Sequence, residues 1–273
     1  MELIEILKVV VLGIVEGVTE WLPISSTGHM LLVDEFIHMN VSESFKDMFF
    51  VVIQLGAILA VVMLFWDKMW PFQTKDKSKP VIRKDVFSMW FKVVVACIPG
   101  AIVTLLFDDY IEAHLHTPTV IALALVVYGV AFIVIENWNK NRTPKVLSLE
   151  DITYRTALMI GLFQVLSIIP GTSRSGATII GALLIGVSRV AAAEFTFFLA
   201  VPVMIGLSFI KILKFGFSFT SIELMTLAIG CVVAFLVSVL VIKFLMSYIK
   251  KRDFKIFGWY RIVLGVILLL YFM

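Results

Sequence analysis

The chain has 273 residues, of which 60% are hydrophobic and 16% are charged, and its mean hydropathy is +1.02. These values lie far from those of a soluble globular domain and exclude that class, so they predict a polytopic membrane protein. The formal net charge of +3 says little about partners, because the distribution of charge along the loops matters more than its sum. We predict no nucleic-acid partner.

Two apolar regions are each interrupted midway by a proline and a run of small hydroxyl residues, namely Leu3 to Phe36 and Tyr154 to Val187. Proline removes a backbone donor, and helices rarely continue through such a break. Non-helical backbone survives at membrane depth only when it is buried in protein or lines a cavity. The sequence therefore predicts two re-entrant helical hairpins packed inside a bundle.

Six further stretches are long and apolar enough to cross a bilayer, and charged residues bound them. The predicted fold is therefore an all-α polytopic membrane protein with six transmembrane helices and two re-entrant hairpins. In chain order the predicted spans run from Met48 to Trp66, Phe87 to Phe107, Pro118 to Ile135, Phe195 to Ile210, Leu224 to Ile242 and Phe257 to Met273.

The two halves of the chain resemble each other weakly when the sequence is shifted by 148 positions. Each half, 1–147 and 148–273, then holds one hairpin followed by three spans. An odd number of crossings turns the second half upside down, which predicts an inverted-topology repeat within one integral membrane domain. The shift superposes Gly13 on Gly161, Glu16 on Gln164, Ser25 on Ser173, Thr27 on Ser175 and Gly28 on Gly176.

Loop charge predicts the orientation independently of the repeat, because basic loops remain cytoplasmic. The intervening loops are mostly acidic, so the first hairpin is predicted to enter from outside and the second from the cytoplasm; Lys211 and Lys214 do not fit this pattern. The basic residues are Lys68, Lys75, Lys77, Lys79, Arg83, Lys84 and Lys92, then Lys140, Arg142 and Lys145, then Lys250, Lys251, Arg252 and Lys255. The acidic residues are Asp34, Glu35, Glu43 and Asp47, then Asp108, Asp109 and Glu112.

Two carboxylates lie inside the first hairpin, at Glu16 and Glu20. Their spacing of four residues places them on one helical face. Charged residues within membrane segments are rare and usually functional, and two like charges on one face favour a bound proton or cation. A divalent ion with oxygen ligands, Mg²⁺ or Ca²⁺, is the natural partner. The alternative is a solvated helix end on which both carboxylates are merely exposed.

Hydroxyl residues follow Pro23 and begin the second half of the first hairpin. They predict a helix cap with several free backbone N–H groups, which together form an anion site. His29 comes directly after them, and an imidazole exchanges protons near neutral pH. A structural role is the alternative for this histidine, but the neighbouring hydroxyls and acids favour a functional one. The run consists of Ser25, Ser26, Thr27 and Gly28.

The second hairpin carries the run PGTSRSGAT, in which hydroxyl residues flank Arg174. A guanidinium beside a helix N-terminus suits a phosphate, because its planar fork binds two oxygens at once. The alternative is that Arg174 pairs with Glu16 or Glu20 and holds the hairpins together. The predicted substrate-binding residues of the two hairpins are Ser25, Thr27, Gly171, Thr172, Ser173, Ser175 and Thr178.

The segments EGVTE and SSTGH, followed by PGTSRSGAT, resemble the undecaprenyl-diphosphate phosphatase family, also called bacitracin-resistance proteins, over essentially the whole chain. The resemblance implies a multi-pass enzyme of the bacterial plasma membrane that removes one phosphate from a C55 isoprenoid diphosphate. This reaction recycles the lipid carrier of cell-wall synthesis and confers resistance to bacitracin. The resemblance further implies a metal-dependent active site that opens to the outer face of the membrane.

Carried over position by position, the family's E-x-x-x-E motif falls on Glu16 and Glu20, and its hydroxyl and imidazole pair falls on Ser26 and His29. Its arginine motif falls on Pro170 to Thr178, with Arg174 at the centre. We see no departure from these motifs. The resemblance thus implies catalytic roles for Glu20, Ser26, His29 and Arg174, and metal binding by Glu16 and Glu20.

Two mechanisms fit these residues. Ser26, activated by Glu20 or His29, is the preferred nucleophile, and direct attack by water with His29 as proton carrier is the alternative. In either case a divalent cation is expected to bridge a glutamate to the phosphate oxygens. The inverted repeat leaves a second function open, a transporter or flippase of an isoprenoid phosphate lipid. Membrane lipid is an expected partner, and the sequence leaves room for a homodimer.

Overall fold

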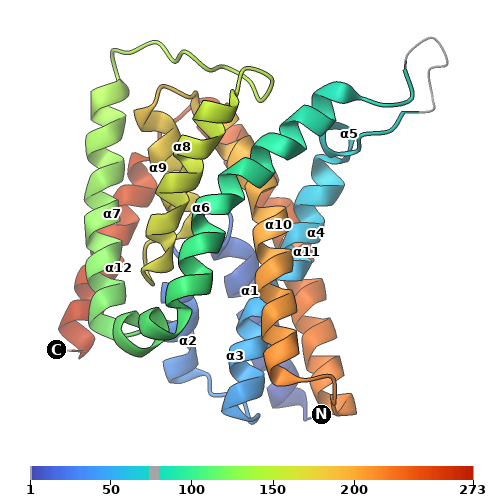
Figure 1. Cartoon of the computed structure of the whole chain (residues 1–273). Helices are drawn as coiled ribbons and strands as arrows, with labels where there is room; N and C mark the ends of the chain where they lie inside the picture. Colours follow the sequence, from blue (N-terminus) through green and yellow to red (C-terminus); the bar gives the residue numbers. More distant parts are fainter. Residues whose placement is uncertain (1, 74–79, 273) are drawn as a thin grey trace.

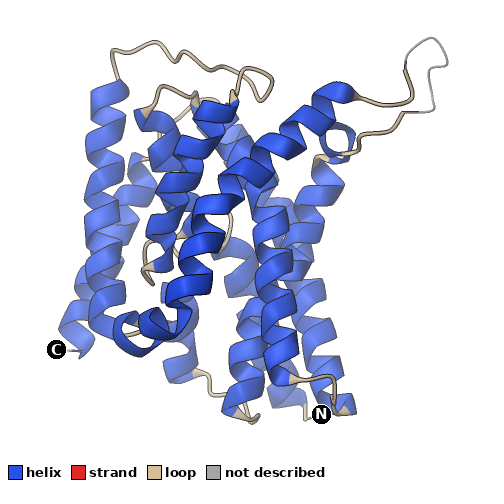
Figure 2. Cartoon of the chain, viewed as in Figure 1, coloured by secondary structure: helices blue, strands red, loops and turns tan. Residues whose placement is uncertain are grey.

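The computed structural model describes residues 2–73 and 80–272, together with all of their side chains except those of residues 31, 108–110, 112 and 113. Throughout this part of the chain the regular structure is helical and no named strand occurs (Figure 2). The predicted all-α fold class is therefore confirmed.

The first half of the described chain contains α1 (Leu3–Thr19), α2 (Ser26–Phe36), α3 (Glu43–Val52), α4 (Gln54–Leu64), α5 (Trp66–Met69), α6 (Lys84–Leu115) and α7 (Pro118–Asn139). The second half contains α8 (Tyr154–Val165), the 3-10 turn η1 (Leu166–Ile168), α9 (Arg174–Leu184), α10 (Arg189–Phe215), α11 (Ser221–Ile249) and α12 (Lys255–Phe272). In each half, an interrupted helix precedes three long apolar helices.

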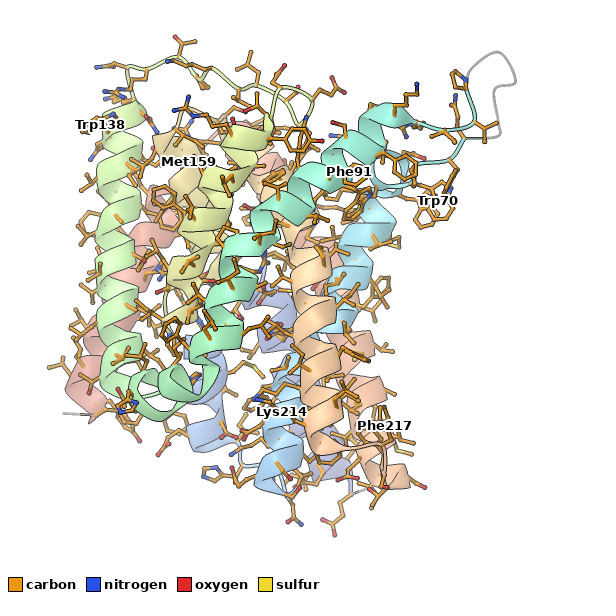
Figure 3. All side chains as sticks on the ribbon, in the orientation of Figure 1. Trp70, Phe91, Trp138, Met159, Lys214 and Phe217 are labelled. Carbon is orange, nitrogen blue, oxygen red and sulfur yellow. The ribbon has the colours of Figure 1, made fainter. Side chains whose placement is uncertain are left out.

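Six apolar helices of the described residues are long enough to cross a bilayer, and each overlaps one predicted span. Large apolar side chains such as Phe91 and Met159 stand on the outside of the bundle (Figure 3). Such an apolar exterior suits hydrocarbon rather than water. The six helices are Glu43–Leu64, Lys84–Phe107, Pro118–Asn139, Arg189–Phe215, Ser221–Ile249 and Lys255–Phe272.

Both interrupted helices break where the prolines and hydroxyl residues predict, and each then folds back on itself. The start of α1 adjoins the end of α2, because Lys8 Nζ donates to the carbonyl oxygen of His38 at 2.7 Å. The end of α9 adjoins the segment before α8, where the Lys145 N–H donates to the Gly186 carbonyl at 2.8 Å. The two pairs open toward opposite ends of the bundle (Figure 1).

Glycines let the helices of these pairs approach their neighbours closely. A Cβ at Gly13 or Gly17 of α1 would fall within about 3 Å of α11 atoms, at Val233 and Val237 respectively. The equivalent helix of the second half, α8, packs on α6 in the same way, with Gly161 against the backbone of Ala96. In lipid no hydrophobic effect drives helices together, so close helix packing relies on small residues of this kind.

The basic loops gather at one end of the bundle. The segment after α7 lies at the upper end in Figure 1, as do α5 and the start of α6. Phe254, between α11 and α12, donates its N–H to Glu136 near the end of α7 at 2.9 Å, which places the third basic loop there as well. Lys214 lies at the opposite end, as its sequence position requires (Figure 3). Some of the charged residues from which the orientation was predicted cannot be placed. Lys75, Lys77 and Lys79 lie outside the described residues, and the side chains of Asp108, Asp109 and Glu112 are not described.

Replacing Gly56 by Ala tests the close packing of α4 on α11. A Cβ at Gly56 would collide with the backbone of Cys231, so Gly56→Ala should lower the free energy of unfolding by about 2 kcal/mol. Gly206→Ala is the matched control, because nothing lies within 4 Å of the added methyl group. The measurement is thermal unfolding in detergent micelles. Equal midpoints for the two variants would contradict this packing.

Candidate active site

Glu20 lies where α1 breaks, and its buried carboxylate joins the two hairpins. One oxygen, Oε2, accepts a hydrogen bond from Ser26 Oγ at 2.7 Å. The other, Oε1, accepts from Arg174 Nη2 at 3.1 Å. The backbone contributes too, since Ser175 Oγ donates to the Glu20 carbonyl at 3.3 Å. Two side chains predicted from separate motifs, Ser26 and Arg174, therefore meet at a single carboxylate.

Glu16 lies one turn before Glu20, and its carbonyl accepts the Glu20 N–H at 3.0 Å. The side chain is 1% exposed, so the alternative of a solvated helix end is wrong. Its Oε1 has no hydrogen-bond partner within the described part of the chain. A buried polar atom without a partner is costly and calls for an explanation such as an unseen ion or water.

Arg174 begins α9 and is held from two sides. Its Nη1 donates to the carbonyl oxygen of Thr196 in α10 at 3.1 Å, and its Nη2 pairs with Glu20. Thr178 lies one turn later, and its hydroxyl binds the Arg174 carbonyl and the Thr196 hydroxyl, each at 2.9 Å. The pairing of Arg174 with a glutamate of the first hairpin, which was the alternative to phosphate binding, is thus observed. Thr178 joins the first turns of α9 to α10 through Thr196.

The helices that begin at the two breaks are capped in the same unusual way. Ser25 (φ 76°) and Ser173 (φ 71°) are the only non-glycine residues with positive φ among those described. Each side chain accepts the N–H of the glycine three residues later, Gly28 at 3.3 Å and Gly176 at 3.2 Å. Such backbone strain persists only where the surroundings enforce it, and it clusters at functional sites. The cap predicted after Pro23 is confirmed, and Ser173 forms a second cap at the position that the sequence shift pairs with Ser25.

His29 uses both of its ring nitrogens. Nδ1 lies 2.7 Å from the carbonyl oxygen of Ser25, and Nε2 lies 2.6 Å from the hydroxyl of Tyr260 in α12. The imidazole and phenol rings are nearly parallel, with an angle of 4° between their planes and 5.6 Å between their centres. Tyr260 was not among the predicted site residues, because an aromatic residue in a span has no distinguishing sequence signal.

The remaining predicted substrate-binding residues differ in their surroundings. Thr27 is exposed, whereas Ser175 and Thr172 are buried. Gly171 has a φ of 89°, and a Cβ there would lie 2.5 Å from the Ile121 carbonyl oxygen, so no other residue fits the turn without strain. The second turn is therefore fixed by backbone geometry as well as by its hydroxyl groups.

Arg261 of α12 was missed by the sequence reasoning and is central to the site. The residue is 0% exposed. Its Nη1 donates to the Pro23 carbonyl at 3.2 Å, and its Nη2 donates to the carbonyls of Gly171 and Thr172 at 2.8 and 2.9 Å. One guanidinium therefore binds the turns of both hairpins. The sequence did contain a signal for Arg261, because an arginine inside the last predicted span is as costly as Glu16 and Glu20 in the first hairpin.

The carboxylates of Glu16 and Glu20 fit a divalent cation that takes most of its ligands from water and substrate. The described residues contain no group of three or more His, Cys, Asp or Glu side chains able to hold a metal. Mg²⁺ commonly binds one or two carboxylates and completes its shell with water and substrate phosphates. Glu16, with its unpartnered oxygen, and Glu20 would supply such a pair of carboxylates.

Six apolar helices, together with a buried carboxylate that binds a hydroxyl and a guanidinium, define a multi-pass membrane protein with an internal polar site. Residues 9–267 match the family described as bacitracin resistance protein BacA. The chain belongs to this family.

Several relatives match the chain along nearly its whole length. An undecaprenyl-diphosphatase of Enterococcus faecalis is 75% identical over 270 residues, covering 99% of this chain and 98% of the relative. Undecaprenyl-diphosphatases of Lachnoclostridium phytofermentans and Desulfitobacterium hafniense are each 63% identical over 273 residues, covering all of this chain and 99% and 98% of the relatives. These matches agree with the resemblance inferred from the motifs.

Replacing Arg261 tests whether one guanidinium holds both turns. Arg261→Met keeps a long side chain but leaves three buried carbonyls without their donor, so it should cost about 3 kcal/mol or more of stability. Arg142→Met is the control, because Arg142 is exposed and lies over the Trp138 ring. The measurement is the amount of monodisperse protein on size-exclusion chromatography after graded heating. Equal heat resistance of the two variants would contradict the role of Arg261.

Proposed function

We propose that this chain hydrolyses undecaprenyl diphosphate to undecaprenyl phosphate and inorganic phosphate, which recycles the lipid carrier of cell-wall synthesis and confers bacitracin resistance. The names of its relatives support this activity, and the family name supports the resistance. The observation that carries the proposal is the Glu20 carboxylate, which binds Ser26 and Arg174 at once. It brings a nucleophile of one hairpin to an anion-binding group of the other.

The terminal phosphate binds between the starts of α2 and α9 in this proposal. Both helices begin inside the protein with strained serine caps, and free N–H groups at a helix start favour an anion. Arg174 adds a full positive charge at the start of α9 and would turn from Glu20 to phosphate oxygens as substrate enters. The carbonyl of Thr196 keeps its guanidinium oriented during that exchange.

Ser26 is the proposed nucleophile, and Glu20 is its base. The Ser26 hydroxyl already donates to Glu20 Oε2 at 2.7 Å, which is the contact that proton removal requires. Attack of Ser26 Oγ on the terminal phosphorus breaks the bond to the bridging oxygen and releases undecaprenyl phosphate. Water then cleaves the phosphoserine and frees inorganic phosphate. Direct attack by water, with His29 as proton carrier, is the competing route.

Glu16 and Glu20 are the proposed ligands of a divalent ion, Mg²⁺ or Ca²⁺. The buried, unpartnered Oε1 of Glu16 supports this assignment. When bound, the ion would supply charge neutralisation for the diphosphate oxygens. Two adjacent carboxylates facing a diphosphate would otherwise repel the substrate, since Arg174 is the single guanidinium paired with them among the described side chains.

The two broken helices are proposed to be re-entrant hairpins related by an inverted-topology repeat. Three features support this: the pairs open toward opposite ends (Figure 1), Ser25 and Ser173 have the same cap, and α1 packs on α11 as α8 packs on α6. The basic end is assigned to the cytoplasm by loop charge, so the first hairpin opens to the outer face of the plasma membrane. Lipid surrounds the apolar exterior, where a second copy of the chain could also bind along the least buried span, α6.

Purified wild-type protein should release one phosphate per undecaprenyl diphosphate, and only with a divalent ion present. Chelation by EDTA should abolish release, and added Mg²⁺ or Ca²⁺ should restore it. Arg174→Lys should lower kcat/KM by about 100-fold, because a lysine cannot replace the planar fork, whereas Arg142→Lys should not. The readout is colorimetric phosphate release in detergent. A protein that binds the lipid but never releases phosphate would instead favour the transporter.

Ser26→Ala separates the two chemical routes. If Ser26 is the nucleophile, the variant should lose turnover by at least about 1,000-fold, and rapid quenching of wild type with labelled substrate should trap phosphoserine. Ser44→Ala is the control, because Ser44 is exposed near the start of α3. Turnover of Ser26→Ala near the wild-type rate would exclude the serine route and leave attack by water.

A further inference from the structure

The protonation pattern of His29 follows from its two contacts. A backbone carbonyl can only accept a hydrogen bond, so Nδ1, which lies 2.7 Å from the Ser25 carbonyl oxygen, carries a proton. In the neutral imidazole Nε2 then has the lone pair. The group that faces this lone pair, at 2.6 Å, is the hydroxyl of Tyr260. Any proton that His29 gains or gives up therefore passes through Nε2, at the Tyr260 hydroxyl.

A tyrosine hydroxyl is suited to both protonation states of the imidazole. It donates to Nε2 while His29 is neutral and accepts from Nε2–H when His29 is protonated, because a hydroxyl can do either. The nearly parallel rings further restrict rotation of the imidazole. Together with the bond to Ser25, this contact holds His29 in one orientation throughout a proton exchange.

The position of Tyr260 is itself fixed by the next residue. Arg261 binds the carbonyls of Pro23, Gly171 and Thr172 and so sets α12 in one register against both turns. Packing of α12 on α7 adds to this, because Gly258 and Gly129 meet with almost no space for a side chain. A helix that contributes no motif residue thereby presents a hydroxyl to His29 from 231 residues away.

We propose that Tyr260 is a positioning residue for His29, fixing the orientation of the imidazole and serving as the hydrogen-bond partner of Nε2 in both protonation states. This inference rests on the proposed function only through the competing route, direct attack by water, in which His29 carries the proton. Nothing in the motifs or in the names of the relatives assigns a role to Tyr260.

The test compares Tyr260→Phe with Tyr271→Phe in the full chain. Both changes remove one hydroxyl from a partly exposed tyrosine of α12, 45% exposed at Tyr260 and 55% at Tyr271, and both keep the ring. Tyr271 packs against Phe36 and Phe272 rather than His29. On the route in which water attacks directly, Tyr260→Phe should lower kcat by about 10-fold with little change in KM, because a misoriented imidazole carries the proton less well. Tyr271→Phe should leave both constants unchanged.

Nitrogen NMR of the histidine-labelled protein gives a readout that a general loss of stability would not move. The chain has four histidines, and His29→Gln identifies the signals of His29. Wild type should show a protonated Nδ1 and a hydrogen-bonded, unprotonated Nε2. Tyr260→Phe should shift the Nε2 signal while Tyr271→Phe does not.

The two readouts separate failure of the inference from failure of the proposed function. The NMR signals require no turnover, so a shift at Nε2 supports the contact even if the protein released no phosphate. If wild type releases phosphate but Tyr260→Phe changes neither kcat nor the Nε2 signal, the positioning role is wrong. A protonated Nε2 with an unprotonated Nδ1 in wild type would overturn it as well.

Discussion

The ion pair between Glu20 and Arg174 is the contact on which the centre of this protein depends. Its partners lie 154 residues apart and belong to two separate helix breaks. In a buried setting, removing one member of such a pair leaves an uncompensated charge that costs several kcal/mol. The pair therefore enforces the approach of the hairpins, and the same approach brings Ser26 to Glu20. In the proposed reaction an anionic substrate would take the place of the Glu20 carboxylate on the guanidinium of Arg174.

The buried charged groups are held in place by close helix packing at small residues and by one further arginine, Arg261. Glycines of α1 and α8 bring these helices against α11 and α6, and residues at the two breaks, such as Ser25 and Thr172, are buried in protein. Arg261 then satisfies carbonyls of both turns that have no helical partner. Strained serine caps at equivalent points, Ser25 and Ser173, are maintained by these surroundings. Stability and the proposed chemistry thus share the same contacts.

Local sequence signals predicted much of this arrangement. The spans follow from runs of apolar residues, and the breaks follow from Pro23 and Pro170 with the hydroxyl residues after them. Glu16, Ser26 and Arg174 were identifiable because each is polar within an apolar segment. Tyr260 gave no such signal, since an aromatic residue is ordinary in a span. Arg261 did give one, but its partners are backbone carbonyls, which have no identity in the sequence.

The sequence alone determined which segments enter the hydrocarbon and where their helices break, because hydropathy and proline act locally along the chain. It also identified the family, because the motifs are short and contiguous. Only the tertiary structure decided that Arg174 pairs with Glu20 rather than Glu16. The same holds for the bond of Thr178 to α10 and for the contact of α12 with both turns. These choices depend on how helices distant in the chain pack, and packing is set by shape and by the satisfaction of buried polar groups across the whole bundle.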